Sequence, residues 1–201
     1  MRNYQRLEEF LNERFLDIYM EPVGEPHTSI IKMMISKTIK DYKIMPGARI
    51  LDVGCGQGTA LQEFRNAGFN PVGICFGEEA KINKNNGFKI IESDMSFLDI
   101  SGEAYDLIWC RHVIEHSIFP YFTISEMYRI LNPGGIFYME VPAAGSISKH
   151  EENPNHYSVH TKEMWNSLLK RSGFSAIHEN EISFATLKGD DLYHCFTCKK
   201  D

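Results

Sequence analysis

Short apolar runs alternate with helical patterns through most of the chain, and this alternation restricts the possible folds more than any other feature. The apolar runs have the length of strands and lie at residues 49–53, 71–75, 88–91, 105–110 and 136–141. Helical patterns at 59–66 and 121–131 stand between some of these runs. A helix is the usual connection between parallel strands, because the crossover needs a dozen or more residues. The alternation therefore predicts an α/β fold with a parallel sheet and helices on both faces.

A different pattern appears near the end of the sequence. A helical segment at 161–171 precedes two apolar strands, at 176–184 and 192–199. The link between these strands, residues 187–191, is too short for a crossover, so the two strands must be antiparallel. We therefore expect the parallel sheet to end in an antiparallel pair.

Two amphipathic helices are expected before the first strand. The first covers residues 4–20 and carries one apolar stripe, and the second covers about 28–42, with prolines in the break between them. We predict that residues 1–45 form a helical cap over the ligand cleft. Residues 46–201 then form the α/β domain.

The composition is that of one globular domain, and it excludes several classes of partner. The 201 residues are 43% hydrophobic, which suffices for a sizeable core and excludes a disordered chain. A net charge of −6 gives no bulk attraction to nucleic acid or anionic lipid, and no apolar run approaches the ~20 residues of a membrane span. The five cysteines cannot all pair, so we expect a reducing, cytoplasmic environment. Cys195 and Cys198 should face opposite sides of their strand and share neither a disulfide nor a metal.

A glycine-rich turn, residues 54–58, follows the first strand and opens a helix. Glycines at this place let the backbone approach a ligand closely, and amide groups at a helix start can bind it. The spacing is G-x-G-x-G, whereas a dinucleotide fingerprint would need glycine at Thr59, so a nicotinamide-dependent oxidoreductase is disfavoured. Asp52, near the end of the strand, is suited to orienting the turn or to accepting a hydrogen bond from a cationic amino group.

The turn resembles the first motif of the class I S-adenosylmethionine-dependent methyltransferases. The resemblance continues in order through residues 93–95, 105–108, 126–135 and 156–174, and it covers about residues 48–200. It implies a three-layer Rossmann-like methyltransferase fold. The seven-stranded sheet of that fold has the order 3-2-1-4-5-7-6, and its last strand is antiparallel.

The resemblance also implies S-adenosylmethionine as the cofactor and assigns residues to it. The glycines would wrap its methionine part, Asp94 and Met95 would contact adenine, and Cys110 and Arg111 would border the methionine moiety. The implied cofactor-binding residues are Asp52, Gly54, Cys55, Gly56, Gly58, Cys75, Asp94, Met95, Cys110 and Arg111. The family usually has an acid where this chain has Cys75, and a thiol is a poor acceptor for two ribose hydroxyls. Backbone groups or Glu78 are the alternatives for holding the ribose.

Residues 111–116, after the fourth strand, contain the candidate catalytic groups. On a helix, His112, Glu115 and His116 would share one face, and His116 could act as a general base. The letters H-x-x-E-H also match a zinc peptidase motif. We reject that interpretation because Pro120 interrupts the long helix that the motif requires.

A divalent metal is a further candidate at this place. Small-RNA 3′-terminal methyltransferases and some ubiquinone-pathway O-methyltransferases have a similar E-x-x-E-H motif and bind one. The resemblance implies the ligands His112, Glu115, His116 and His156. Imidazole and carboxylate ligands favour Mn, Fe, Co or Zn over Mg. Without a metal, these residues would line the acceptor pocket. We expect the two segments that carry His112, His116, His156 and His160 to meet at one cleft, with His160 in a packing role because the family more often has an aromatic residue there.

The sequence therefore predicts an enzyme that transfers a methyl group from S-adenosylmethionine to a small-molecule or glycan-type acceptor, oxygen rather than nitrogen. A metal-assisted methyltransferase acting on RNA ribose and a non-catalytic S-adenosylmethionine-binding module are the alternatives. The negative net charge makes nucleic acid the less favoured acceptor. The oligomeric state is left open.

Overall fold

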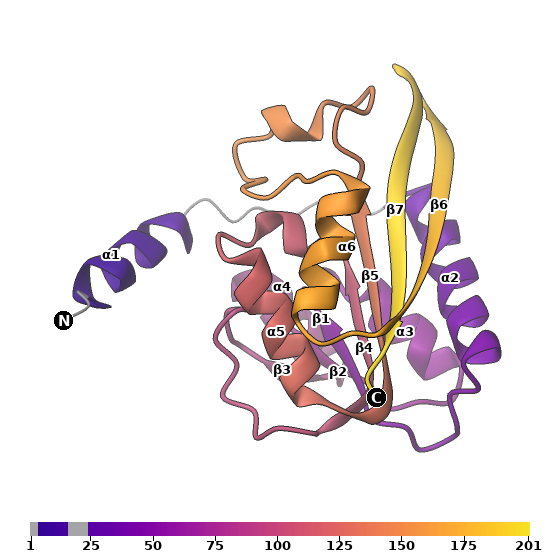
Figure 1. Cartoon of the computed structure of the whole chain (residues 1–201). Helices are drawn as coiled ribbons and strands as arrows, with labels where there is room; N and C mark the ends of the chain where they lie inside the picture. The colour runs from indigo at the N-terminus through magenta and orange to yellow at the C-terminus, as the bar shows by residue number, and fades with distance from the viewer. Residues whose placement is uncertain (1–3, 16–23) are drawn as a thin grey trace.

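The computed structural model describes residues 4–15 and 24–201, and these form one seven-stranded sheet flanked by helices (Figure 1). The strand order is β3-β2-β1-β4-β5-β7-β6, and β7 is antiparallel to both of its neighbours, as predicted. The strands are β1 Ile50–Val53, β2 Val72–Ile74, β3 Lys89–Ile91, β4 Tyr105–Arg111, β5 Leu131–Pro142, β6 Ala176–Thr186 and β7 Gly189–Lys199. The Rossmann-like methyltransferase fold is thereby confirmed.

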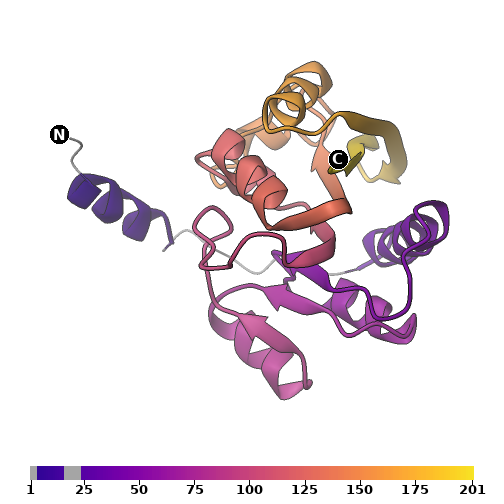
Figure 2. The same ribbon diagram turned by 60° about the horizontal axis from the view of Figure 1, so that its bottom comes forward.

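Helices cover both faces of the sheet, as the alternation predicts (Figure 2). On one face, α2 and α3 pack on Leu107 and Trp109 of β4. On the other, α5 and α6 pack on Ile108 and Cys110, because successive strand residues point to opposite faces. The helices are α1 Tyr4–Phe15, α2 His27–Asp41, α3 Thr59–Asn66, α4 Gly77–Asn85, α5 Pro120–Ile130 and α6 Lys162–Arg171.

Some element boundaries differ from the prediction. Helix α4 was not predicted, because it buries only Ala80 and Asn83 and so lacks an apolar stripe. Helix α5 begins at Pro120 itself, since proline is favoured in the first helical turn. The terminal strands run up to a tight turn at residues 187–188, and the resulting hairpin projects beyond the rest of the sheet (Figure 1).

The two N-terminal helices pack differently, and the cap that they are predicted to form stays a prediction. Ile31 and Ile35 of α2 are buried in the same cluster as Trp109 and Tyr138, so α2 is a layer of the α/β sandwich. Helix α1 lies beside the domain (Figure 1), and the rest of the predicted first helix, up to Met20, lies outside the described residues. The domain boundary at residue 45 stays a prediction.

The cysteines follow the predicted pattern. Cys195 packs in the cluster beneath α2 and α3, and Cys198 packs in the cluster beneath α5 and α6, so the two face opposite sides of β7. All five cysteines are free thiols. Within residues 4–15 and 24–201, no helix has the length and apolar character needed to cross a membrane.

Candidate active site

The glycine-rich turn connects β1 to α3, and its three glycines serve different purposes. All three have positive φ, +67° at Gly54, +48° at Gly56 and +86° at Gly58. A Cβ at Gly54 would lie 2.2 Å from Val113, and one at Gly58 would lie 2.1 Å from Asn83. A Cβ at Gly56 would meet only Oε1 of Glu79, at 3.7 Å. Packing therefore requires Gly54 and Gly58, whereas Gly56 borders open space.

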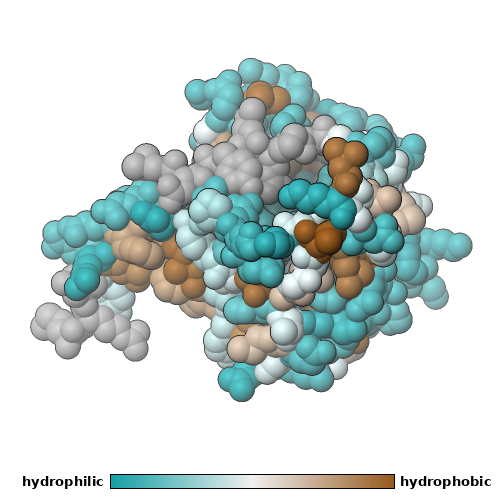
Figure 3. All heavy atoms as spheres, turned by 90° about the horizontal axis from the view of Figure 1, so that it is seen from above, coloured by the Kyte–Doolittle hydropathy of each residue, from teal (hydrophilic) through white to brown (hydrophobic). Residues whose placement is uncertain are grey.

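That open space belongs to a cavity of about 500 Å³ at the carboxyl ends of the parallel strands. Figure 3 looks at the molecule from above and shows a mainly hydrophilic face with scattered hydrophobic groups. The predicted cofactor residues that line the cavity are Asp52, Gly54, Cys55, Gly56, Cys75, Asp94, Met95 and Arg111. Gly58 and Cys110 do not line it, because Gly58 is buried against Asn83 and Cys110 points into the core beneath α5 and α6. Leu11 and Arg14 of α1 and His27 and Ile31 of α2 also line it, so both N-terminal helices reach the cavity.

Asp52 supplies the polar atom that best fits a ligand. Its side chain is 3% exposed, and Oδ2 has no hydrogen-bond partner within residues 4–15 and 24–201. Burial, together with Cys75, raises the pKa of Asp52 well above its usual range. A cationic amino group at Oδ2 would satisfy this oxygen and stabilise its charge. The amino group of S-adenosylmethionine meets that requirement.

The adenine and ribose positions also have candidate contacts. Oδ1 of Asp94 accepts a hydrogen bond from the backbone amide of Ser96 at 2.7 Å, which fixes the turn after β3. Glu79 on α4 lines the cavity near Gly56. Glu78, the alternative named above for the ribose, is exposed, pairs with Lys81 at 3.2 Å and does not line the cavity. The sequence did not indicate Glu79 because helix α4 went unrecognised.

The segment after β4 is not the predicted helix. Only Ile114–His116 is helical, as one 3-10 turn, and His112 stands before it with a φ of +55°. The expected common face of three residues is therefore wrong. One ligand atom from each of Glu115, His116 and His156 nevertheless lies within 4.8 Å of the others.

His112 is outside that group and belongs to a buried charge cluster centred on Glu140. Glu140 is fully buried on β5, its Oε1 lies 2.7 Å from Nε of Arg111 and 3.2 Å from Nε2 of His112, and Tyr138 donates to its Oε2 at 2.6 Å. Burial alone would raise the pKa of Glu140, but His112, Arg111 and Tyr138 hold that pKa below its usual range. Nη2 of Arg111 also lies 3.3 Å from Nδ1 of His27. The cluster fixes Arg111 and His112 at the cavity wall.

Of the other histidines in the two predicted segments and the loop between them, some line the cavity and one does not. Nδ1 of His116 lies 2.9 Å from the backbone oxygen of Asn155, and its ring meets His156 edge-on at 4.8 Å between centroids. His150 lines the cavity and stacks on His156 at 5.6 Å. His160 does not line the cavity, because it packs against Trp165 at 4.8 Å. His112, His116 and His156 therefore line the cavity, and the packing role expected of His160 is confirmed.

Comparison with known proteins shows the family. The model of a family described as a methyltransferase domain matches residues 32–179, which is more than half of the chain. The chain belongs to this methyltransferase family. Its matched part begins within α2 and ends in β6, so it contains the glycine-rich turn and the histidine segments.

The methyltransferase chain is similar to curated relatives whose activities differ from one another. It is 26% identical to the sterol 24-C-methyltransferase of Schizosaccharomyces pombe, covering 74% of this chain and 43% of that protein. It is 29% identical to the ubiquinone biosynthesis O-methyltransferase of Hahella chejuensis, covering 48% of this chain and 44% of that protein. The chain spans about half or less of the length of these two curated relatives.

Solved methyltransferases share its fold. An S-adenosylmethionine-dependent methyltransferase from Archaeoglobus fulgidus superposes with a TM-score of 0.69 at 17% identity, covering 84% of this chain and 94% of that one. A second solved structure is the phosphoethanolamine N-methyltransferase 2 of Haemonchus contortus in complex with phosphomonomethylethanolamine and S-adenosylhomocysteine. It superposes with a TM-score of 0.71 at 15% identity, covering 90% of this chain and 54% of that one. These likenesses show the fold, and the cavity of this chain lies at the strand edge beside Asp52 and Gly56.

Proposed function

We propose that this chain transfers a methyl group from S-adenosylmethionine to an oxygen atom of a small molecule. The main support is the cavity at the carboxyl ends of β1 and β2, where Gly56 leaves open space beside the unsatisfied oxygen of Asp52. Asp52 would hold the amino group, Glu79 and Cys75 the ribose, and Asp94 and Met95 the adenine. The cofactor supplies an activated methyl group, and the chain's own residues orient it and the acceptor.

The acceptor would occupy the end of the cavity lined by histidines. Holding two reactants in line can supply much of the rate enhancement of a transfer to an already reactive methyl group. His116 stays our candidate for contacting the acceptor, because its Nδ1 contact to Asn155 leaves Nε2 on the other side of the ring. Glu115 and His112 lie near His116 in the chain. His112 contacts Glu115 and is held in place by the Glu140 cluster. The cavity of about 500 Å³ must hold the cofactor as well, so the space left for the acceptor favours a small molecule or a sugar unit.

Cofactor binding tests the proposal directly. We expect calorimetry to show one S-adenosylhomocysteine bound per chain and no binding of NADH. A panel of hydroxyl and amine compounds, assayed with S-adenosylmethionine by release of S-adenosylhomocysteine, then tests catalysis. Cofactor binding without turnover of any acceptor would favour the non-catalytic binding module, and preference for NADH would overturn the proposal.

A metal-assisted reaction is the second candidate, and the group of Glu115, His116 and His156 favours it. The contact of His116 Nδ1 with a backbone oxygen is the kind of outer hydrogen bond that orients a metal-binding imidazole. A metal held there would act as a Lewis acid toward a substrate hydroxyl. An RNA ribose acceptor belongs to this candidate, although the net charge of −6 disfavours it.

Calorimetric titration with Mn, Co and Zn tests this second candidate. We expect one metal ion to bind per chain. We expect His156→Ala to lower the metal affinity by at least about tenfold, because one metal ligand is lost. His160→Ala is the matched control, since His160 packs on Trp165 away from the cavity. Equal metal affinity in both variants would contradict the site.

We further propose a reducing compartment such as the cytoplasm for this chain. Its five buried cysteines are all unpaired, which favours a compartment where thiols stay reduced. Determination of the thiol count in protein purified from cells under non-reducing conditions would check this.

A further inference from the structure

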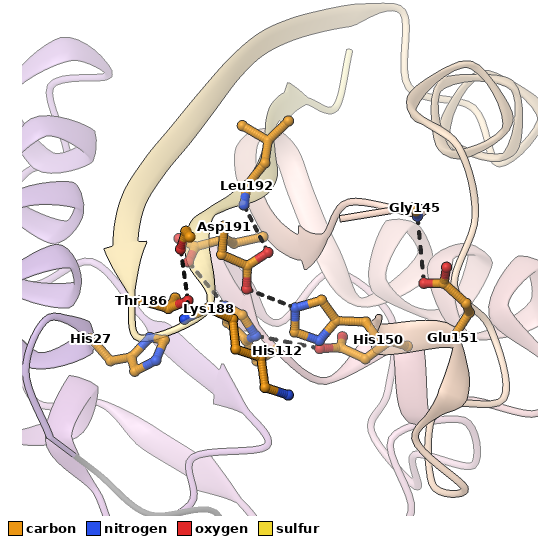
Figure 4. A network of polar contacts seen from close by, with 12 residues as sticks. His27, His112, Gly145, His150, Glu151, Thr186, Lys188, Asp191 and Leu192 are labelled. Carbon is orange, nitrogen blue, oxygen red and sulfur yellow. Dashed lines mark hydrogen bonds and ion pairs between the residues drawn. The ribbon is translucent and has the colours of Figure 1, made fainter. Parts of the chain in front are cut away.

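His150 is held in the cavity wall by an acid from the end of the sheet. It begins the short 3-10 helix His150–Glu152, and its Nε2 lies 3.0 Å from Oδ2 of Asp191 on β7 (Figure 4). Asp191 is only 2% exposed, and its Oδ1 accepts a hydrogen bond from the backbone amide of Leu192 at 2.9 Å. The acid thereby connects the loop after β5 to β7.

This contact determines which nitrogen of His150 carries hydrogen. Burial alone would raise the pKa of Asp191, but hydrogen bonds from Ser148 and His150 hold that pKa below its usual range. Asp191 is therefore ionised near neutral pH and has no proton to donate. A hydrogen must therefore lie on Nε2, and in the neutral form of an imidazole held this way Nδ1 has the lone pair. Within residues 4–15 and 24–201, no hydrogen bond is made to this Nδ1.

The ring of His150 is also fixed by its neighbours. It stacks on His156 at an interplanar angle of 12° and lies 6.1 Å from the ring of Tyr193, centroid to centroid. The side chain is 17% exposed and lines the cavity. The lone pair of Nδ1 is therefore held in one direction at the cavity wall.

The charges around the cavity are distributed unevenly. Within the described residues, the carboxylates that line it are all at the cofactor end, and they are Asp52, Glu79 and Asp94. Three buried acids lie nearer the histidines, and none of them lines the cavity: Glu140 faces Arg111, Asp191 faces His150, and Glu115 contacts His112 at 3.5 Å. An ammonium acceptor would meet no carboxylate in the lining at that end, whereas a hydroxyl group can donate to a neutral imidazole.

We propose that His150, oriented by Asp191, binds the methyl acceptor by accepting a hydrogen bond from its hydroxyl group, so that the acceptor is an uncharged alcohol or phenol and not an amine. This inference rests on the proposed methyl transfer, because it names the second substrate of the same cavity. Asp191 acts as a positioning residue, since it reaches the acceptor only through His150.

The first test is the tautomer of His150 in the full chain. Long-range ¹⁵N–¹H spectra should show His150 with hydrogen on Nε2, and Asp191→Asn should abolish that single tautomer because the acceptor-only carboxylate is gone. A wild-type His150 with hydrogen on Nδ1 would overturn the proposal. This measurement does not depend on cofactor binding.

The second test uses matched probes on protein saturated with S-adenosylhomocysteine. Cyclohexanol and phenol should bind and shift the Nδ1 signal of His150, whereas cyclohexylamine should do neither. His150→Phe keeps the ring but removes both nitrogens, and we expect it to weaken the hydroxyl probes about tenfold while leaving S-adenosylhomocysteine affinity unchanged. His178→Phe, at an exposed position of β6, is the control and should change nothing.

The outcomes separate the two proposals. The role of His150 would be overturned if the amine and the alcohol bound equally well. It would also be overturned if His150→Phe left the affinity for the hydroxyl probes unchanged. A wild-type chain that binds no S-adenosylhomocysteine would instead overturn the proposed methyl transfer. An unfolding midpoint of His150→Phe close to that of the wild type shows that any loss is local.

Discussion

Gly56→Val is expected to reduce the affinity for S-adenosylhomocysteine by at least about a hundredfold, which is a loss of about 2.7 kcal/mol of binding free energy. A side chain at this position would project into the cavity, where the nearest atom to its Cβ is Oε1 of Glu79 at 3.7 Å. The new methyl groups would occupy space that the ligand needs beside the turn. Calorimetry on the folded variant measures the effect.

The control must reproduce the backbone strain without filling the cavity. Valine at φ +48° adopts the left-handed region at a cost of about 1–3 kcal/mol, so the variant should also be less stable. Gly47 has a φ of +87° with nothing within 4 Å of a Cβ, and it does not line the cavity. Gly47→Val should therefore lose stability but keep its affinity. Retained affinity in Gly56→Val would contradict the assignment of the glycine-rich turn to the cofactor.

Glu140→Gln should lower the free energy of unfolding by about 3 kcal/mol, the largest stability effect that we predict. The change keeps the side-chain volume but leaves the charge of Arg111, whose side chain is 10% exposed, without its partner at 2.7 Å. His112 and Tyr138 also lose the ionised group that they contact. Urea denaturation measures the loss.

Two further variants distinguish charge from packing. Arg111→Met combined with Glu140→Gln removes the unpaired charge and should recover part of the lost stability. The changes in the free energy of unfolding of the two single variants should therefore not add up to that of the double variant. Asp41→Ala removes the exposed pair with Lys37 and should leave stability unchanged. A loss in Glu140→Gln no larger than that in Asp41→Ala would show that the buried cluster contributes nothing to the fold.

The features that could be predicted from the sequence are those that depend on periodicity and chain length. Alternation of apolar and helical segments predicts the parallel sheet, and the short link at 187–191 predicts the terminal antiparallel pair. The position of Gly56 after a strand and before a helix predicts a ligand contact. The sheet and the terminal pair are confirmed, and Gly56 borders the cavity, while its ligand contact stays a prediction.

The features that could not be predicted depend on backbone geometry and distant contacts. His112 leaves the expected face because its φ is +55°, which spacing does not reveal. Glu79 was missed because a helix that buries little has no periodic signal. Glu140, by contrast, is an acid inside an apolar strand, and a residue of this kind indicates a buried partner from its sequence context alone.

The placement of Asp191 and Tyr193 on β7 has a consequence for biosynthesis. The ribosome makes β1, the glycine-rich turn and β4 long before it makes β7, and β7 must insert between β5 and β6 to complete the sheet. The half of the cavity around Asp52 is thus encoded early, whereas the support of His150 becomes available only when the last strand has been translated and has paired. A nascent chain arrested before residue 189 would contain the cofactor residues but would lack the residue that orients His150.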